Sequence, residues 1–275
     1  MTETPRNLTT IAVAPNGGRK TKADHPAVPL TAAELARTAA ECLEAGAAMI
    51  HVHVRTPDGS HLLDADAYLE ATAAIRGETG DRILVQITSE ALGQYAPEAQ
   101  RDVVRKVRPQ SASLALRELV PDESEEKAFA ELLSWMKAEQ VVPQIILYTP
   151  DEATRLSDMM RRGLIPAEDI PVLYVLGRYT EKQISEPTDL LPFLAPGLPS
   201  FAHWSVCAFG ARETACVTAA ALLGGHMRVG FENNLWLPDS SVAASNAEIV
   251  AATAAAVAAT GLQPGDATAW LPKGW

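Results

Sequence analysis

The sequence of 275 residues contains only three cysteines and six histidines, and it lacks long apolar runs. Cys42, Cys207 and Cys216 are widely spaced and form no CxxC pair, which favours reduced thiols over a disulfide framework or a cysteine zinc site. No run approaches the roughly 18 apolar residues that span a bilayer, and no basic N-terminal segment precedes an apolar stretch. We therefore expect a soluble, cytoplasmic protein that does not bind membranes.

Basic residues are also scarce. The chain has 23 Lys and Arg against 34 Asp and Glu, a net charge of −11. Nucleic-acid binding depends on Lys and Arg that neutralise phosphates, so this balance argues against a nucleic-acid partner. A small anionic ligand held by a few local basic groups remains compatible with it. The hydrophobic content of 47% can form a large core, and no linker or low-complexity segment interrupts the chain. We expect a single domain over 1–275.

Short runs rich in Val, Ile and Leu alternate eight times with longer stretches of helical period. The candidate strands span 9–14, 48–54, 82–87, 111–116, 142–147, 172–176, 201–207 and 227–231. The candidate helices span about 31–45, 64–78, 97–107, 123–139, 151–162, 181–191, 210–223 and 242–260. Strands that are apolar at nearly every position indicate burial on both faces, and eight such pairs in about 250 residues predict a (β/α)8 TIM barrel. An open doubly wound sheet is the alternative, but no GxGxxG follows the first strand.

Helix boundaries and one loop also carry sequence signals. Thr31 and Glu34 have the spacing of a capping box, in which each side chain accepts a hydrogen bond from the other residue's backbone N–H. Gly46 stands where a left-handed residue commonly ends a helix. The Pro-rich stretch 187–199 predicts a loop around the sixth helix.

The stretch MIHVHVR, residues 49–55, places two histidines one residue apart in an apolar run. Side chains alternate along a strand, so His51 and His53 share one face and both imidazoles can reach a single cation. The alternative is a pair of buried neutral histidines that bond to their neighbours. Metal binding is the favoured interpretation, because burying two unpaired imidazoles is costly.

A catalytic zinc ion uses three protein ligands and one open position, so a third ligand is needed. Glu232 lies in HMRVGFENN, just after the last predicted strand. In a closed barrel the first strand neighbours both the second and the eighth, so the ends of those two strands lie close together. His51, His53 and Glu232 therefore predict a site for Zn²⁺ or another divalent cation. The alternative for Glu232 is a solvated loop carboxylate.

Five segments carry a resemblance to a known family. They read APNGGRKTKADHPAVPLTAAELA, CLEAGAAMIHVHVRTPDG, VQITSE, SASLALRE and LGGHMRVGFENN, and HVHVR together with GGHMRVGFE is the most specific combination. On these segments the protein resembles the β-keto acid cleavage enzymes over essentially its whole length. The resemblance implies a (β/α)8 barrel, usually a homotetramer, with zinc or a similar ion on the two histidines and the glutamate. It also implies a reaction in which a β-keto acid and acetyl-CoA give acetoacetate and a new acyl-CoA.

The resemblance implies roles for further residues. Arg228 matches an arginine that works in proton transfer and substrate orientation, although a structural ion pair is the alternative. Thr88 and Ser113, near the ends of the third and fourth strands, match hydroxyl positions that contact substrate, and Ser89 is a neighbour that can substitute for Thr88. The same hydroxyls could instead cap the helices that follow.

Two acidic positions of the family are amides in this chain. Asn233 stands where relatives commonly have the aspartate beside the metal-binding glutamate, and an amide cannot accept a proton as a carboxylate does. We keep Asn233 as a catalytic candidate and add Glu90 and Glu118 as substitutes for the missing base. Gln144, a substrate-binding candidate, replaces a glutamate of many relatives.

A third departure concerns the substrate. The stretch NGGRK supplies Asn16 and Arg19 as substrate-binding candidates, and Arg19 stands where relatives that act on an amino-substituted substrate have a glutamate. A cation there would repel an amine and favour an acidic or neutral side chain. The alternative is that Arg19 lies on a solvated loop or helps to hold the phosphates of CoA.

Three functions are compatible with these features. The leading hypothesis is a zinc-dependent acyltransferase that cleaves a β-keto acid with acetyl-CoA. The second keeps the metal barrel but makes it a hydrolase or a retro-aldolase, because two expected acids are missing. The third is a catalytically silent metal-binding barrel.

Overall fold

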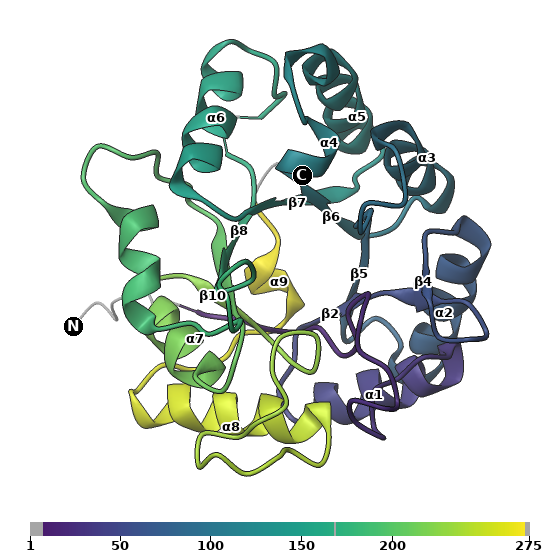
Figure 1. Ribbon diagram of the computed structural model, residues 1–275, viewed down its shortest axis with the longest axis vertical. Coiled ribbons are helices and arrows are strands. Elements are labelled where there is room, and N and C mark those ends of the chain that lie inside the picture. Colours follow the sequence, from purple (N-terminus) through teal and green to yellow (C-terminus); the bar gives the residue numbers. More distant parts are fainter. Residues whose placement is uncertain (1–7, 168, 273–275) are drawn as a thin grey trace.

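The computed structural model describes residues 8–167 and 169–272, and it has eight parallel strands in a closed ring. Helices surround this ring (Figure 1). The predicted (β/α)8 barrel is therefore confirmed, while the ends of the predicted domain 1–275 lie outside the described residues. The barrel strands are β1 (Ile11–Val13), β2 (Met49–Val52), β5 (Leu84–Thr88), β6 (Ser111–Ala115), β7 (Val142–Leu147), β8 (Val172–Leu176), β9 (Trp204–Ala208) and β10 (His226–Val229).

The helices follow the strands around the outside of the barrel. They are α1 (Ala32–Glu44), α2 (Ala65–Thr79), α3 (Pro97–Val107), α4 (Leu116–Leu119), α5 (Glu126–Ala138), α6 (Pro150–Arg161), α7 (Glu213–Leu222), α8 (Asn246–Ala259) and α9 (Ala267–Trp270), with 3-10 segments η1 (Glu123–Glu125) and η2 (Pro187–Leu194). The predicted capping box begins α1, since Glu34 N donates to Thr31 Oγ1 and Thr31 N donates to Glu34 Oε2, both at 3.2 Å. Among the described residues, no helix has the length and apolar character needed to cross a membrane.

Strand β1 closes the ring, because it pairs with β2 on one side and with β10 on the other. This pairing confirms the expectation that the second and last barrel strands meet at the first. On β2, Ile50 and Val52 point into the large apolar layer between strands and helices. Trp270 from α9 fills the inside of the barrel at the amino-terminal ends of the strands, where it packs on Met49, Leu84 and Val142. The candidate site lies at the opposite end, where the strands have their carboxyl-terminal residues.

The second predicted strand, 48–54, is divided in the structure. β2 ends at Val52, and Val54–Arg55 (β3) leaves the barrel to pair antiparallel with His61–Leu62 (β4). His53 lies between the two strands, at the mouth of the barrel. The hairpin keeps its backbone hydrogen-bonded outside the barrel wall, which allows the chain to leave the wall directly after the histidines.

The predicted sixth helix at 181–191 is wrong, and so is the prediction that all of 187–199 is loop. The structure has turns over 181–182 and the 3-10 segment η2 over Pro187–Leu194. Gln183 has a positive φ of 48°, and Pro187 and Pro192 have no backbone N–H to donate to an α-helical ladder. The last predicted helix, 242–260, begins later, at Asn246, because Ser245 caps it.

Gly230, directly after β10, provides a test of how tightly the barrel closes. Its φ is +129°, and an added Cβ would lie 2.6 Å from the carbonyl oxygen of Ala14 and 3.0 Å from Oδ1 of Asn246. We expect Gly230→Ala to lower the free energy of unfolding by about 1–2 kcal/mol through backbone strain and by about 1–3 kcal/mol more through overpacking. Urea denaturation measures this loss.

Gly224→Ala is the matched control for this substitution. Gly224 has a φ of +94°, but a Cβ added there meets no atom within 4 Å. Only the backbone strain of about 1–2 kcal/mol applies at this position. Equal losses of stability in the two variants would contradict the close packing at the end of β10.

Candidate metal and active site

A cavity lies at the carboxyl-terminal ends of the barrel strands, where active sites of such barrels gather. One side of it is polar and comes from β2, β5, β10 and the residues that follow them. The opposite side is largely apolar and comes from β6 to β9 and the residues that follow them. The lining residues are His51, His53, Thr88, Glu90, Ala115, Ile146, Tyr148, Val175, Arg178, Phe209, Arg228 and Glu232.

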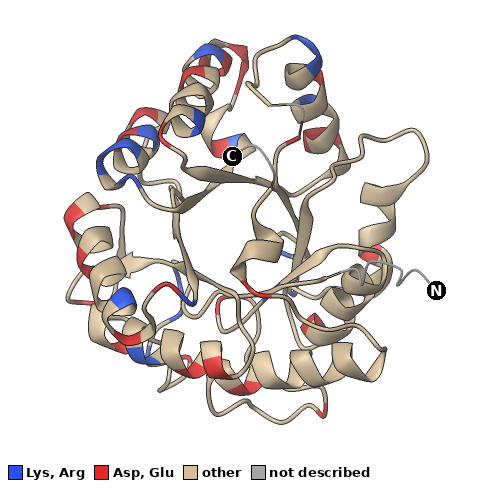
Figure 2. Ribbon diagram, turned by 180° about the vertical axis from the view of Figure 1, so that it is seen from behind, with Lys and Arg blue, Asp and Glu red and all other residues tan. Residues whose placement is uncertain are grey.

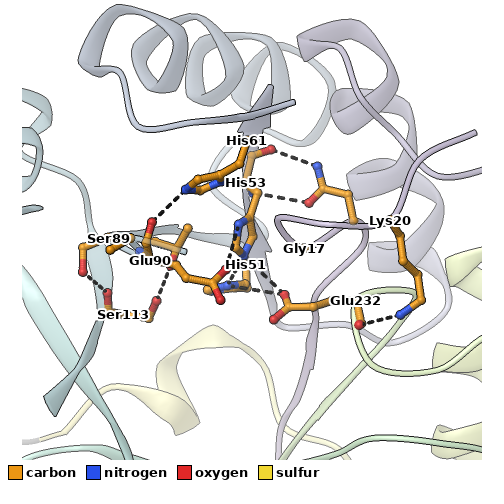
Figure 3. A network of polar contacts seen from close by, with 12 residues as sticks. Gly17, Lys20, His51, His53, His61, Ser89, Glu90, Ser113 and Glu232 are labelled. Atoms are coloured by element: carbon orange, nitrogen blue, oxygen red, sulfur yellow. Dashed lines mark hydrogen bonds and ion pairs between the residues drawn. The ribbon is translucent and has the colours of Figure 1, made fainter. Parts of the chain in front are cut away.

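The structure brings the three predicted metal ligands together at the polar side of this cavity (Figure 3). The Nε2 atoms of His51 and His53 lie 3.1 Å apart. Oε2 of Glu232 lies 3.6 Å from the first of these nitrogens and 3.5 Å from the second. Ligand atoms around a tetrahedral zinc ion with bonds of about 2.0–2.1 Å are about 3.3 Å apart. The spacing of the three atoms therefore fits such an ion.

The environment of Glu232 also fits a cation. Its Oε1 accepts a hydrogen bond of 3.0 Å from Nη2 of Arg228, while its buried Oε2, which faces the two imidazoles, has no hydrogen-bond partner among the described residues. Burial by itself would raise the pKa of this carboxyl group, but Arg228 and then the two histidines outweigh burial and hold the pKa well below its usual range. The carboxylate is thus charged, with one oxygen left to coordinate an ion.

A buried hydrogen-bond chain determines which nitrogen of His51 faces this carboxylate. Nδ1 of His51 lies 2.8 Å from Oε1 of Gln86. Nε2 of Gln86 donates to Oγ of Ser111 at 3.1 Å and to Oε1 of Gln144 at 3.2 Å. Because both amide hydrogens of Gln86 are donated, its oxygen must accept from Nδ1–H of His51. Nε2 of His51 is therefore the nitrogen with a free lone pair.

The neutral state of His51 follows from the same surroundings. Burial, with the nearby Arg228 adding to it, lowers the pKa of His51 to about 3. Gln144 lies beneath the cavity in this hydrogen-bond chain, where its Nε2 donates to Ser205 Oγ at 3.2 Å, and it lines neither of the two cavities at the barrel mouth. This position argues against the predicted contact of Gln144 with substrate and gives the side chain a role in orienting Gln86.

Asn16 positions the backbone of the second histidine. Its Nδ2 donates to the carbonyl oxygens of His53 at 2.8 Å and Pro29 at 2.9 Å, and its Oδ1 accepts from the backbone N–H of His53 at 3.3 Å. The amide of Asn16 is thus committed to the protein backbone rather than free for a substrate. Within the part of the chain that the structure describes, Nδ1 of His53 has no hydrogen-bond partner, and Oε2 of Glu90 lies 3.6 Å from it.

The three predicted hydroxyl residues form one cluster, but they are not equally placed. Oγ1 of Thr88 accepts from Ser113 Oγ at 3.1 Å and from the backbone N–H of Glu90 at 3.0 Å. Oγ of Ser89 donates to the carbonyl oxygen of Ser113 at 3.1 Å. Of the three, only Thr88 lines the cavity, and its own hydroxyl hydrogen remains free to be donated there. Ser89 and Ser113 support Thr88 from behind.

The candidate bases differ sharply in position. Glu90 lines the cavity, whereas Oε2 of Glu118 accepts from the backbone N–H of Ala91 at 2.9 Å, away from both cavities. Burial raises the pKa of Glu118. Asn233 is buried, lines neither cavity, and makes no hydrogen bond through its side chain to any residue of 8–167 or 169–272. Among the three candidates, Glu90 is the one that a substrate in the cavity would meet.

A second, larger cavity of about 320 Å³ adjoins the first and shares Glu90, Arg178, Phe209 and Glu232 with it. Its other lining residues are Asn16, Gly17, Gly18, Arg19, Lys20, Asp24 and Gln183. Arg19 is exposed at this cavity, as expected for a ligand contact or a solvated loop. Nζ of Lys20 donates to the carbonyl oxygen of Glu232 at 2.8 Å, and burial lowers the pKa of this lysine.

Several site residues escaped prediction from the sequence. Tyr148, Arg178 and Phe209 line the first cavity and lie within two residues of the ends of β7, β8 and β9. The rule that barrel active sites gather at these ends could have identified them. Gln86 had no such signal, because its role depends on contacts with strands that are distant in sequence.

The fold and the site define the class of this protein: a (β/α)8 barrel enzyme with a candidate metal centre at the carboxyl end of its sheet. The chain belongs to the beta-keto acid cleavage enzyme family, whose model matches residues 9–269. The resemblance inferred from the sequence motifs is thereby confirmed. The roles of individual site residues stay predictions.

Two relatives and one solved structure illustrate this similarity. The chain is 29% identical over 248 residues to a 3-keto-5-aminohexanoate cleavage enzyme of Fusobacterium nucleatum subsp. nucleatum, with 87% of this chain and 88% of that one covered. It is 27% identical over 252 residues to a 3-oxoadipate:acetyl-CoA acetyltransferase of Cupriavidus necator, with 89% and 87% covered. The apo structure of ObcA matches with a TM-score of 0.68 at 15% identity, over 88% of this chain and 64% of that chain, and it supports the barrel fold.

The hydrogen bond from His51 to Gln86 can be tested by its effect on metal affinity. We expect Gln86→Leu to weaken zinc binding by about 10–100-fold, because the imidazole loses the acceptor that orients it. Competition with a chromogenic chelator measures the affinity. Ser111→Ala is the matched control, since Gln144 still orients the amide of Gln86, and it should bind zinc nearly as tightly as the wild type. His51→Ala and Glu232→Ala should lose the metal, and a wild-type affinity in Gln86→Leu would refute the proposed orientation.

Proposed function

We propose that this enzyme cleaves a β-keto acid with acetyl-CoA and produces acetoacetate and a new acyl-CoA, with a divalent ion held by His51, His53 and Glu232. The convergence of three ligand atoms at tetrahedral spacing, at the mouth of the barrel, carries this proposal. The names of the two relatives support it, since one is a 3-oxoadipate:acetyl-CoA acetyltransferase and the other a keto acid cleavage enzyme.

The bound ion, for which we infer zinc from its two imidazole ligands and one carboxylate, supplies a Lewis acid that polarises the β-keto acid. Arg228 adds positive charge beside it. This guanidinium donates through Nη2 to Glu232 and to Sγ of Cys207, while its buried Nε and Nη1 have no hydrogen-bond partner in the described ranges. Burial by itself would lower the pKa of Arg228, but the neighbouring Cys207 and Glu232 raise this pKa by more than burial lowers it. The side chain is therefore charged. Its unpaired donors suit a substrate carboxylate or a developing oxyanion.

We assign proton transfer to Glu90. Its carboxylate takes a proton from the carbon between the two carbonyl groups of the β-keto acid, which leaves an enolate. The enolate carbon attacks the acetyl thioester, a carbon–carbon bond forms, and the CoA thiolate leaves. The thiolate then attacks the original keto carbon, and the bond between that carbon and the central carbon breaks. Glu90 returns the proton to the central carbon, which is released as part of acetoacetate.

The remaining cavity residues assist these steps. Thr88 donates its free hydroxyl hydrogen to an oxygen of the substrate. Burial, followed by the charge of Glu90, raises the pKa of Tyr148 well above its usual value, so this phenol stays neutral and acts as a donor. Ala115, Ile146 and Val175 form an apolar wall that excludes water, which would otherwise hydrolyse the thioester.

Matched isosteric substitutions of Glu90 and Glu118 test which of the two carboxylates is the base. We expect Glu90→Gln to lower kcat by about 10²–10⁴-fold with little change in KM, because an amide cannot accept the proton. Glu118→Gln should keep most activity, since an amide oxygen can still accept from the N–H of Ala91. Coupled assays of acetoacetate and acyl-CoA formation measure both variants. Equal activity in the two variants would contradict the assignment.

The same assay tests the reaction class. Wild-type enzyme loaded with zinc should convert a panel of neutral, acidic and basic β-keto acids only when acetyl-CoA is added. Turnover without acetyl-CoA would indicate a hydrolase or retro-aldolase instead. The homotetramer implied by the resemblance, and the cytoplasmic location, stay predictions, and light scattering on the purified protein tests the first.

A further inference from the structure

The two adjoining cavities at the barrel mouth, taken together, differ from the rest of the molecule in their charge. The chain as a whole carries a net charge of −11, and acidic residues are spread over its outer helices (Figure 2). The two adjoining cavities nevertheless combine four cationic side chains with three carboxylates. The cations are Arg19, Lys20, Arg178 and Arg228, and the carboxylates are Asp24, Glu90 and Glu232.

Each of these carboxylates already has a partner within the protein. Oδ2 of Asp24 accepts from the backbone N–H of Thr21 at 2.8 Å and from its hydroxyl at 3.3 Å. Glu232 pairs with Arg228, and Glu90 faces His53. Within the described residues, none of the three forms an ion pair with Arg19 or Arg178.

Two of the cations have no such partner. Within the described ranges 8–167 and 169–272, no carboxylate oxygen lies within 4.0 Å of the guanidinium of Arg19 or Arg178. Arg178 instead lies over the ring of Phe209, with 5.1 Å between its Cζ atom and the ring centroid. A guanidinium on an aromatic face keeps its N–H donors directed outward, where they can form paired hydrogen bonds to a carboxylate.

The sizes of the cavities indicate what approaches these arginines. The first cavity, which contains the candidate catalytic groups, is the smaller of the two, at about 20 Å³. The second has about 320 Å³ and borders Glu90 and Glu232 directly. Of the two, only the second has space for the side chain of a substrate whose keto acid group lies at the metal ligands.

We propose that the second cavity receives the side chain of the β-keto acid, and that Arg19 and Arg178 bind a carboxylate at its end. The substrate is then a β-keto dicarboxylic acid. This inference rests on the proposed function. The phosphates of CoA are the other anions in the reaction, but they lie at the far end of the pantetheine arm, whereas this cavity adjoins the reacting groups. An ammonium group at the end of the side chain would be repelled.

Three β-keto acids of equal backbone length test the proposal: 3-oxoadipate, 3-oxohexanoate and 6-amino-3-oxohexanoate. We expect kcat/KM of the wild type to be about 10–100-fold higher for 3-oxoadipate than for 3-oxohexanoate, and lowest for the amine. Arg19→Gln and Arg178→Gln should each reduce that ratio toward one, and Arg19→Glu should raise activity on the amine. Lys22→Gln is the matched control, because Lys22 pairs with Glu34 and lines neither cavity, so the ratio should not change.

Two outcomes would overturn the inference while leaving the proposed reaction intact. One is a wild-type preference for the neutral or amino substrate. The other is a rise in the KM for acetyl-CoA in the arginine variants with every keto acid, which would assign these arginines to the CoA phosphates.

A binding measurement tests the carboxylate site formed by Arg19 and Arg178 independently of the proposed reaction. Calorimetry should show that glutarate binds more tightly than butyrate, and that Arg19→Gln and Arg178→Gln remove this difference. That result without turnover of any β-keto acid would support the carboxylate site and overturn the proposed function. Equal binding of the two probes would overturn the inference.

Discussion

The parallel pairing of β1 with both β2 and β10 closes the barrel, and the candidate site depends on this closure. It brings His51 and His53, near the end of β2, to within 3.6 Å of a carboxylate that follows β10, although 179 to 181 residues separate them in sequence. Gly230 permits the close approach, because any side chain there would collide with the backbone of Ala14 beside it. The three candidate metal ligands therefore lie on, or within three residues after, two strands of the closed barrel.

Inside this wall, buried polar groups are arranged so that each constrains the next. Ser205, Gln144 and Gln86 form a chain that ends at Nδ1 of His51, while Arg228 restrains Glu232 from the other side. Buried polar groups are costly unless they are paired, so such a chain persists only in one arrangement. Three of the buried polar atoms without a partner among the described residues, Oε2 of Glu232 and two nitrogens of Arg228, lie where a cation and an anionic substrate are expected.

The two amides that the resemblance assigns to acidic positions of the family, Gln144 and Asn233, lie in different surroundings. Gln144 is part of the support beneath His51, where an amide can both donate and accept, as the neighbouring Gln86 and Ser205 require. Asn233 lines neither of the two cavities. Of the candidate bases Asn233, Glu90 and Glu118, only Glu90 lines the first cavity.

The sequence by itself determined the features that depend on local periodicity. Eight alternations of apolar and helical stretches predicted the barrel, the spacing of His51 and His53 placed them on one face, and Thr31 with Glu34 marked the start of α1. These follow from short-range geometry, which the order of residues specifies directly. Only the tertiary structure decided that Glu90 rather than Glu118 lines the cavity and that Gln86 orients His51. The tertiary structure also decided that the helix-like pattern over 181–191 forms no α-helix, and that the 3-10 segment η2 lies there instead. These contacts join strands that are far apart in sequence. Which side chains meet depends on the register of the barrel strands and on where each loop turns, and residue spacing alone does not encode either.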